Sequence, residues 1–275
     1  MSSVPPGSLS VVATPIGHRD DISARAIQTL REVAVIAAED TRHSRPLLQH
    51  YRIDTPLVAL HEHNEREVVD GLVRRMVEGE SVALISDAGT PLISDPGFRL
   101  VRAARAAGVR CIPVPGACAA IAALSVAGLP SDRFVFEGFL PPKAAARRAR
   151  LQELSGESRT LIFYESSHRV AESLADMRDL FGAGREAVLA RELTKLFETV
   201  LGEPLDELAA RVAADPDQQR GECVVLVAGR GEEADARLAE GQRVFAILRE
   251  ELPPAKAAKL AAAISGAPRK LLYET

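Results

Sequence analysis

The sequence has little sulfur and few aromatic side chains. Its 275 residues include three cysteines, no tryptophan and 4% aromatic residues in total. Cys111, Cys118 and Cys223 form no CxxC pair, which argues against a disulfide framework and fits a reducing compartment. No stretch reaches the roughly 18 uninterrupted apolar residues that span a membrane. The first eight residues lack the basic stretch and the apolar run of a signal peptide. We therefore expect a cytoplasmic protein with no membrane partner.

Familiar catalytic and nucleotide-binding signatures are also missing. The chain contains no GxxxxGK[ST], no GxSxG and no HExxH, and no GxGxxG links a strand to a helix. His61 and His63 are not accompanied by a second ligand pair at metal-binding spacing, so no metal is expected. The formal net charge of −4 argues against a protein that coats nucleic acid through global attraction. Any contact with RNA must therefore be local.

What is present is an alternation of short apolar runs with longer helical patterns. Strands are predicted at residues 9–13, 33–37, 82–85, 111–114, 134–136, 160–164, 188–190 and 223–227. Residues 65–78 and 168–181 carry apolar side chains at the spacing of a single buried helical stripe, and Ser23 is a predicted helix N-cap. The alternation predicts an α/β fold with a largely parallel sheet.

Turn-rich breaks divide the chain into three parts. One break lies at residues 128–132, and a second at residues 229–233 follows the last predicted strand. We predict an N-terminal α/β domain (1–128), a C-terminal α/β domain (129–231) and a tail of three short helices (235–275). Breaks at 252–254 and 265–268 separate the tail helices.

Five loops follow predicted strands, at the strand ends where open α/β sheets bind ligands. They cover residues 13–18, 86–97, 113–119, 163–169 and 190–198. In the loop 86–97, glycine and proline bring backbone amides close to a ligand, and we interpret Asp87 as a ligand-binding carboxylate. Asp95 is interpreted instead as the N-cap of a helix at 97–107, with Pro96 at its first position.

The motifs in these loops resemble one family closely. The series VATPIGxxxD, AEDTR, SDAGTPxISDPG, YESxHR and ARELTKxxE is similar to that of the tetrapyrrole methylase superfamily, in particular its RNA-directed branch. The resemblance runs from about residue 9 to residue 229, and KAAKLAAxIxG in the tail looks like that branch's helix-turn-helix extension. The departures are mild, because only His18 and Ser167 replace the Asn and Pro that are common there.

The resemblance implies a cofactor, a substrate and a set of contacts. It implies two α/β domains of the class III methyltransferase type with S-adenosylmethionine in the cleft between them, and a homodimer. The implied reaction is 2′-O-methylation of a cytidine in the decoding region of 16S rRNA, either naked or in the small ribosomal subunit. Carried over residue by residue, the cofactor contacts fall at Pro15, Asp87, Thr90, Ala117, Cys118, Ala119, Phe163, Ala190 and Val225.

The chemistry of this reaction places modest demands on the protein. A sulfonium methyl group is already activated, so the protein mainly has to align the attacking oxygen. A base that takes the proton of this oxygen, or a cation that stabilises its negative charge, would assist the reaction. The hypothesis ranks Lys195, as an alkoxide stabiliser, and Glu192 first, followed by Asp40 and then Glu165. Glu192 and Lys195 can equally form an ion pair that only shapes the cleft.

Two segments carry enough positive charge to contact phosphates locally. The predicted contacts are Lys143, Arg147, Arg148 and Arg150 in the first segment, and Lys256, Lys259, Arg269 and Lys270 in the tail. The first segment can instead be a solvated helix face, and the tail can serve dimer packing.

Two other functions fit the same fold. A methylase acting on a tetrapyrrole or on a protein side chain is one, although AEDTR and ARELTK resemble the RNA-directed branch. A non-catalytic rRNA-binding assembly factor is the other, although the intact loops at Pro15, Asp87 and Ala117 argue against a decayed cofactor pocket.

Overall fold

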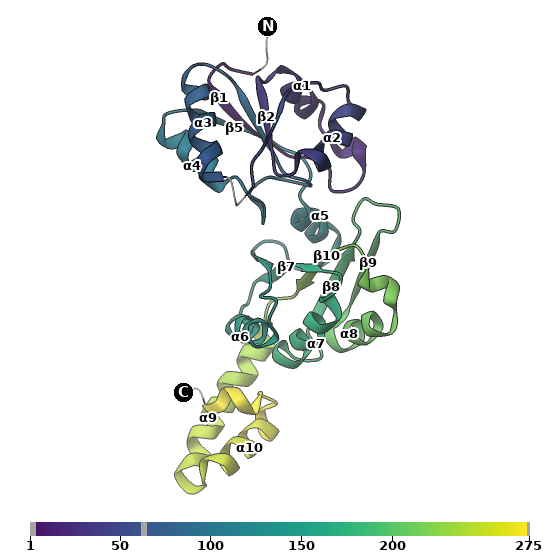
Figure 1. Cartoon of the computed structure of the whole chain (residues 1–275). Coiled ribbons are helices and arrows are strands. Elements are labelled where there is room, and N and C mark those ends of the chain that lie inside the picture. Colours follow the sequence, from purple (N-terminus) through teal and green to yellow (C-terminus); the bar gives the residue numbers. More distant parts are fainter. Residues whose placement is uncertain (1–3, 62–64, 274–275) are drawn as a thin grey trace.

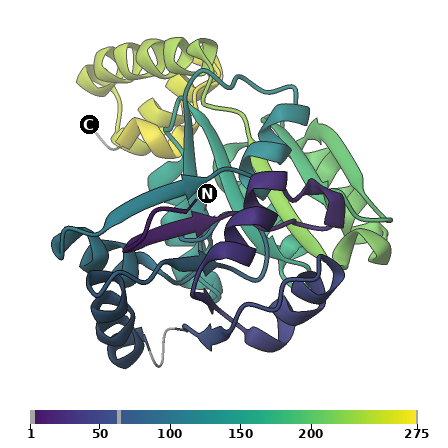
Figure 2. The ribbon, with the colours of Figure 1, turned by 90° about the horizontal axis from the view of Figure 1, so that it is seen from above.

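The chain folds into three parts, which are arranged in space in the same order as in the sequence (Figure 1). The computed structural model describes residues 4–61 and 65–273. Two α/β units lie one above the other, and the helical tail extends from the far side of the second unit. Viewed from above, the tail projects to one side of both sheets (Figure 2). No helix in the described part of the chain is long and apolar enough to cross a membrane.

The first unit is built on an all-parallel sheet. Its strands are β1 (Ser8–Val12), β2 (Val35–Ala38), β3 (Leu57–Ala59), β4 (Val82–Ile85) and β5 (Arg110–Val114). They are ordered β3-β2-β4-β1-β5, and each pairing is parallel. The carboxyl ends of the strands therefore meet at one edge, where their loops are brought together.

Helices cover both faces of the first sheet, which explains why β2 and β4 are apolar throughout. One face packs against α1 (Ala24–Glu32) and α2 (Thr41–His50), and the other against α3 (Glu65–Val77) and α4 (Phe98–Ala106). The predicted N-cap is confirmed, because the Ser23 side chain accepts a hydrogen bond from the Ala26 amide. Strand β3 was not predicted; it has only three residues, all of them half-buried.

The second sheet is mixed. Its strands are β6 (Phe134–Phe139), β7 (Thr160–Ser166), β8 (Glu186–Arg191), β9 (Thr199–Pro204) and β10 (Glu222–Val227), in the order β6-β7-β10-β8-β9. Only the β6–β7 pairing among them is parallel. The prediction of a largely parallel sheet is therefore wrong for this unit. The edge strand β9 also escaped prediction, because Gly202 and Pro204 interrupt its apolar pattern.

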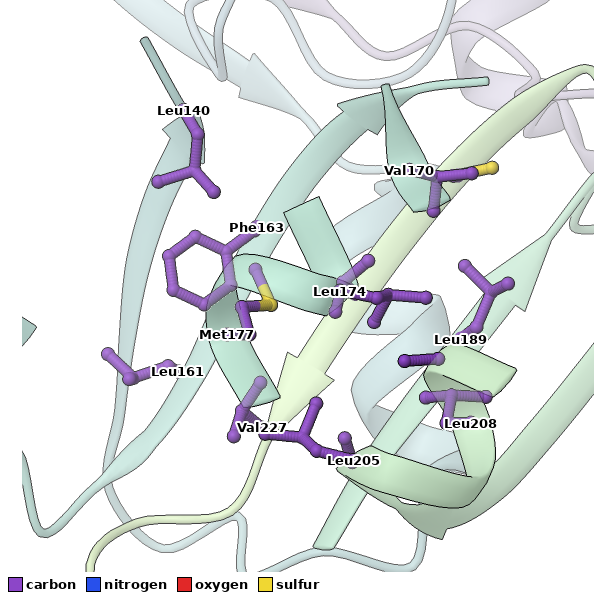
Figure 3. Close-up of a cluster of buried hydrophobic side chains, with 14 of the residues drawn as sticks. Leu140, Leu161, Phe163, Val170, Leu174, Met177, Leu189, Leu205, Leu208 and Val227 are labelled. Carbon is purple, nitrogen blue, oxygen red and sulfur yellow. The ribbon is translucent and has the colours of Figure 1, made fainter. Parts of the chain in front are cut away.

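The core of the second unit lies between this sheet and three helices, α6 (Ala144–Leu154), α7 (Val170–Phe181) and α8 (Leu205–Ala214). Figure 3 shows Phe163 of β7 packed near Leu174 and Met177 of α7 in this core. The opposite face packs against α5 (Ala119–Val126). Since α5 belongs to the second unit by its packing, we place the change of unit between β5 and α5 and not after residue 128.

The tail consists of α9 (Glu232–Glu251), α10 (Pro254–Ser265) and a short 3-10 helix (Arg269–Tyr273). Phe245, Ala258 and Leu272 belong to its small separate core. The predicted breaks at 252–254 and 265–268 are confirmed. The first tail helix was predicted to be short but has 20 residues.

Candidate active site

A cavity of about 340 Å³ lies between the two α/β units. The first unit contributes Ile16 from the loop after β1 and the segments 88–90 and 93–95 from the loop after β4. The second unit contributes Ala119 of α5, residues of β6, β7 and β8, and residues 221–224. This volume is typical of pockets that hold a small ligand.

Three loops of the first unit are tied together beside the cavity. The Thr14 amide donates to the Gly89 carbonyl at 2.9 Å, and the Gly89 amide donates to the Thr14 carbonyl at 3.1 Å. The Thr90 hydroxyl donates to the Ala117 carbonyl at 2.9 Å. Gly89 has φ +80°, and a Cβ there would lie 3.3 Å from Ile16. The first-unit wall is therefore mostly backbone and small side chains.

Backbone strain is concentrated in the two loops that face the cleft. Leu92 and Ser94 in the β4–α4 loop have φ of 75° and 66°, and Glu192 and Thr194 in the β8–β9 loop have φ of 52° and 65°. Such left-handed conformations at residues other than glycine are held by their surroundings and cluster at functional sites.

The β8–β9 loop also touches the first unit directly. The His18 amide donates to the Thr194 hydroxyl at 3.0 Å. A Cβ at Gly17 would lie 2.5 Å from Cγ of Lys195, so only glycine allows this approach. The contact joins the first-unit loop after β1 to the second unit beside the cavity.

The interpretation of Asp95 as a helix cap is wrong. Helix α4 begins at Phe98 after Gly97, and its N-terminus has no side-chain cap. The positive φ of 117° at Gly97 turns the chain there, which leaves Asp95 in the cavity lining. Burial raises the pKa of Asp95 to about 6, opposed by a hydrogen bond with Ser86 and assisted by the nearby charge of Asp87.

The Asp87 carboxylate joins the loops after β2 and β4. Its Oδ1 accepts a hydrogen bond from the Asp40 amide at 3.1 Å. Asp40 in turn caps α2, where its Oδ1 accepts from the Arg42 amide at 2.8 Å and its Oδ2 pairs with the Arg42 guanidinium at 2.8 Å. The hydrogen bonds from Arg42 hold the pKa of Asp40 well below its usual range. Asp40 is therefore a weak base.

The Lys195 side chain lies in an ion-pair cluster. Its Nζ is 2.8 Å from Oε1 of Glu192 and 3.1 Å from Oε2 of Glu222. Burial opposes the charge on Lys195 and Glu192, but these contacts raise the pKa of Lys195 and lower that of Glu192. Both stay charged, and the sequence-based alternative of a cleft-shaping ion pair is present in the structure. A direct role of either residue in catalysis stays a prediction.

Glu165 is held on both carboxylate oxygens. Its side chain is fully buried; Oε2 accepts from the Ser173 hydroxyl at 2.6 Å, and Oε1 pairs with Arg169 at 2.6 Å and accepts from the Ser166 amide at 2.7 Å. These contacts anchor β7 to α7. The geometry favours a structural role over that of a base.

The predicted cofactor contacts divide into three groups. Thr90, Ala119 and Ala190 line the cavity. Pro15, Asp87, Ala117 and Cys118 are sequence neighbours of lining residues. The side chains of Phe163 and Val225 are 0% exposed and belong to the core on the opposite face of the second sheet; Figure 3 shows Phe163 there.

The side chains of Phe163 and Val225 therefore cannot make the cofactor contacts predicted for these residues, and contact through their backbone stays a prediction. Because strand side chains alternate between faces, Tyr164 and Val224 line the cavity in their place. The Tyr164 hydroxyl accepts from the Ala120 amide at 3.2 Å, and burial raises its pKa. Phe139 and Asp95 are further lining residues that sequence reasoning missed.

The first basic segment is neutralised by acids that are distant in sequence. Arg147 is 3% exposed; its Nε lies 2.7 Å from Asp176 and its Nη2 3.2 Å from Glu172. Phosphate cannot reach this guanidinium, so the predicted RNA contact at Arg147 is wrong. The other two arginines are also ion-paired, Arg148 with Asp176 and Asp179, and Arg150 with Glu137 and Glu153.

The remaining predicted cations are exposed. Lys143 lies at the N-terminus of α6. In the tail, Lys256, Lys259, Arg269 and Lys270 are exposed, and Lys270 Nζ donates to Oε1 of Gln152 in α6 at 3.1 Å. In the described ranges, no three His, Cys, Asp or Glu side chains lie close enough to hold a metal ion. His63 lies outside the described residues.

The part of the chain that forms the two α/β units matches a family of methylases. Residues 8–209 match the family model of Tetrapyrrole (Corrin/Porphyrin) Methylases. The fold is shared with the methyltransferase CobJ (TM-score 0.60, 22% identity, 81% of this chain and 94% of that one). It is also shared with uroporphyrin-III C-methyl transferase from Thermus thermophilus complexed with S-adenosyl homocysteine (TM-score 0.56, 16% identity, 80% and 97%).

Relatives of much higher identity narrow this class. The Ribosomal RNA small subunit methyltransferase I of Pseudomonas aeruginosa is 65% identical over 272 residues, which cover 98% of this chain and 96% of that protein. The protein of the same name from Escherichia coli O157:H7 is 52% identical over 268 residues (98% and 94%). Residues 235–275 match the RsmI C-terminal HTH domain.

The chain belongs to the tetrapyrrole methylase family and, within it, to the ribosomal RNA small subunit methyltransferase I group. This membership confirms the sequence-based predictions of fold class, of a methyltransferase and of S-adenosylmethionine as cofactor.

Proposed function

We propose that the protein transfers a methyl group from S-adenosylmethionine to the 2′-oxygen of a cytidine in the decoding region of 16S rRNA. The observation that carries the proposal is the 65% identity to a ribosomal RNA small subunit methyltransferase I over nearly the whole chain, tail included. The solved structures of CobJ and of the uroporphyrin-III C-methyl transferase are 22% and 16% identical to this chain, which supports a common fold and not a common substrate.

The cavity lining fits the proposed cofactor. Ala88, Gly89 and Ala190 leave the backbone open to close approach, and Ile16 and Leu193 offer apolar surface to a flat adenine ring. Asp87 is the neighbour of the lining residue Ala88 and is proposed to accept hydrogen bonds from an amine or a ribose hydroxyl. The residues proposed to hold the cofactor are Pro15, Asp87, Thr90, Ala117, Cys118, Ala119 and Ala190. When bound, S-adenosylmethionine supplies a methyl group activated by its positive sulfur.

The second-unit wall has a positioning role in this reaction. The ion pairs among Glu192, Lys195 and Glu222 fix the β8–β9 loop to β10, and the hydrogen bond from the His18 amide to the Thr194 hydroxyl joins that loop to the first unit. We propose that Lys195 also lowers the energy of negative charge on the attacking oxygen. The negative charges of Glu192 and Glu222 offset much of the electrostatic field of the Lys195 ammonium, which limits this stabilisation.

RNA contact is proposed for Lys143 and for the tail. Lys256 and Lys259 lie on α10 and are exposed, so phosphates can reach them. Replacing both lysines by Glu should reduce the salt slope of RNA binding by about 2, since each phosphate contact contributes about one. Arg133→Glu at an exposed site away from the tail is the control. An unchanged slope in the double variant would exclude these two lysines from RNA contact.

We also propose a homodimer that works in the cytoplasm, where ribosomal subunits are assembled. Leu196 and Phe197 in the β8–β9 loop are 89% and 67% exposed, which suits burial against a second copy. Analytical ultracentrifugation of Leu196→Asp should show monomers where the unmodified protein shows dimers. Monomers in both samples would contradict the proposal.

A methyl-transfer assay tests the proposed function directly. The full chain should label 16S rRNA or the 30S particle from radiolabelled S-adenosylmethionine, and nuclease mapping should locate the label on a cytidine 2′-oxygen. A tetrapyrrole is the comparison substrate. Label on the tetrapyrrole alone, or no label with either RNA substrate, would overturn the proposal.

A further inference from the structure

The catalytic cavity offers no positive side chain to an RNA chain. In the described part of the molecule, its lining contains three acidic side chains and no Lys, Arg or His. RNA carries a negative charge on each phosphate, and a large share of its affinity for proteins comes from Lys and Arg contacts to these phosphates. If the protein acts on RNA as proposed, it therefore has to hold the RNA backbone outside this cavity.

A second cavity, of about 760 Å³, lies between the second α/β unit and the tail. It is lined by parts of α6 and α7, of the segments 182–186 and 228–231, and of the tail. Helices α6 and α7 cover the face of the second sheet opposite to the catalytic cavity, and the tail extends from that side (Figure 1). We call this cavity the tail groove. The second sheet separates it from the catalytic cavity.

The tail groove is rich in basic side chains. Its lining includes five basic residues, which are Arg148, Arg185, Arg230, Arg237 and Lys270, and two acidic residues, Asp179 and Glu186. The whole chain, in contrast, has a formal net charge of −4. The basic residues come from segments that are distant in the sequence, so the fold concentrates them in one place. A cleft lined mainly by charges of one sign attracts ligands of the opposite sign.

Contacts near both ends of the tail hold the groove in shape. Where the tail begins, the Arg230 amide donates to the Glu157 carbonyl at 2.7 Å. Near the other end of the tail, Lys270 Nζ donates to Oε1 of Gln152 in α6 at 3.1 Å. The tail is therefore docked on the second unit at two places, and the groove lies between them.

The two sides of the groove present their positive charges differently. On the side of the second unit, the Arg185 guanidinium donates to three backbone carbonyls and lies 5.0 Å from the centroid of the Phe181 ring, which fixes its position. On the tail side, Arg237 and Lys270 are exposed, so phosphates can reach them. Gly184 in the lining is also exposed, and no atom lies within 4 Å of a Cβ there. The groove therefore has room for a sugar-phosphate chain beside its basic side chains.

We infer that the tail groove binds the sugar-phosphate backbone of the substrate RNA, away from the nucleotide that is methylated. This inference rests on the proposed function. Contacts from Arg and Lys to phosphates position an RNA without reading its sequence. Because the second sheet separates the groove from the reacting atoms, these contacts are the same before and during methyl transfer. Such uniform binding lowers KM and leaves kcat unchanged.

Arg237→Glu combined with Lys270→Glu tests the inference, because it reverses two exposed charges of the groove. We expect the salt slope of binding to 30S particles or 16S rRNA to fall by about 2, since each lost phosphate contact removes about one. The KM for the same RNA should rise about tenfold, with kcat nearly unchanged. The calorimetric Kd for S-adenosylhomocysteine should stay normal, because the catalytic cavity is untouched.

The matched control for this variant is Arg243→Glu combined with Arg249→Glu. It makes the same charge change at exposed positions of the same tail but outside the groove lining. Its salt slope and KM should stay close to those of the unmodified protein. A salt slope that is unchanged in the groove variant, or lowered equally in the control, would overturn the inference.

Gly184→Trp tests the shape of the groove without changing its charge. The new side chain has space at its Cβ and should occlude the groove, which should raise the KM for RNA and leave kcat unchanged. Gly71→Trp on α3, where a Cβ also meets no atom within 4 Å, is the control and should keep a normal KM. A normal KM in Gly184→Trp, or a fall in kcat in place of the rise in KM, would overturn the inference. An unmodified protein that binds RNA but labels none would instead refute the proposed function, and the salt slopes would still show whether the groove binds RNA.

Discussion

The two walls of the cavity hold their charges in opposite ways. On the second-unit wall, Glu165 is paired with Arg169, and Lys195 with Glu192 and Glu222. On the first-unit wall, the Ser86 hydroxyl is the one side-chain hydrogen-bond partner of Asp95 in the part of the chain that the structure describes. Paired charges fix positions and are costly to break, whereas an unpaired carboxyl in a cleft has a perturbed pKa and is free to react. The difference predicts which substitutions should damage the fold and which should damage the chemistry.

The largest effect on stability is expected on the paired wall, from Glu165→Gln. This change leaves Arg169 without its carboxylate, and breaking so buried a pair costs about 3 kcal/mol. Urea unfolding measures the loss. Glu153→Gln, whose pair with Arg150 is exposed, should cost less than about 0.5 kcal/mol. Normal stability with lost turnover would instead make Glu165 a catalytic group and remove the contrast between the walls.

A larger residue at Gly17 should disrupt the contact between the loop after β1 and the β8–β9 loop, which joins the two walls of the cavity. A Val side chain there would collide with Lys195 and with the Leu193 carbonyl, 2.9 Å from the Cβ position. We expect the affinity for S-adenosylhomocysteine to fall about tenfold, or about 1.4 kcal/mol, in calorimetry. Gly184→Val is the control, because no atom lies within 4 Å of its Cβ position. Unchanged affinity would show that the cavity does not need this contact.

Lys195→Met tests whether the paired wall also contributes to chemistry. We expect a loss of about 1 kcal/mol in stability, because Glu192 keeps only its hydrogen bond from the Glu222 amide. The kcat should fall about tenfold, since two carboxylates offset the field of the ammonium. A fall beyond 100-fold at normal S-adenosylhomocysteine affinity would make Lys195 a principal catalytic residue. No fall would leave it as an ion-pair partner alone.

The smallest expected effect is a gain in stability at the unpaired wall. The pKa of Asp95 is about 6 in the folded protein and ordinarily 3.8, so folding favours its protonated form. The ionised carboxyl therefore lowers the free energy of unfolding. This loss is fully present above pH 6, shrinks as the pH falls, and is nearly absent near pH 4. The group is only half-buried and partly screened, so Asp95→Asn should gain about 1 kcal/mol at pH 8. Thermal melts at pH 8 and pH 4 check the sign, and a loss of stability at pH 8 would contradict it.

The fold was predictable where local patterns govern it. Strand β4 was predicted with its correct bounds, because helices cover both faces and leave a continuous apolar run. The mixed second sheet was not predictable, since strand direction depends on how distant segments pair. Strand β9 was missed because an edge strand with alternating exposure gives a weak apolar signal. The packing of α5 on the second sheet is likewise a contact between distant segments.

The candidate site was predicted loop by loop but not side chain by side chain. The loops after β1 and β4 of the parallel sheet reach the cavity, as the strand-end rule requires, and the loop after β8 of the mixed sheet reaches it as well. The side chains of Tyr164 and Val224 line the cavity and those of Phe163 and Val225 do not, because the face that a strand side chain occupies depends on the pleat and the packing. The Arg147 prediction was wrong because its neutralising acids, Glu172 and Asp176, lie on another helix.

The sequence alone determined the α/β class, the three-part order of the chain and the family, because periodicity and motif spacing are properties of neighbouring residues. It also singled out the loop 86–97, part of which lines the cavity. Only the tertiary structure decided that Asp95 lines the cavity and does not cap α4, since Gly97 turns the chain before the helix begins. Only the tertiary structure, too, decided which charges are paired, because ion pairing depends on atoms that the chain brings together from far apart.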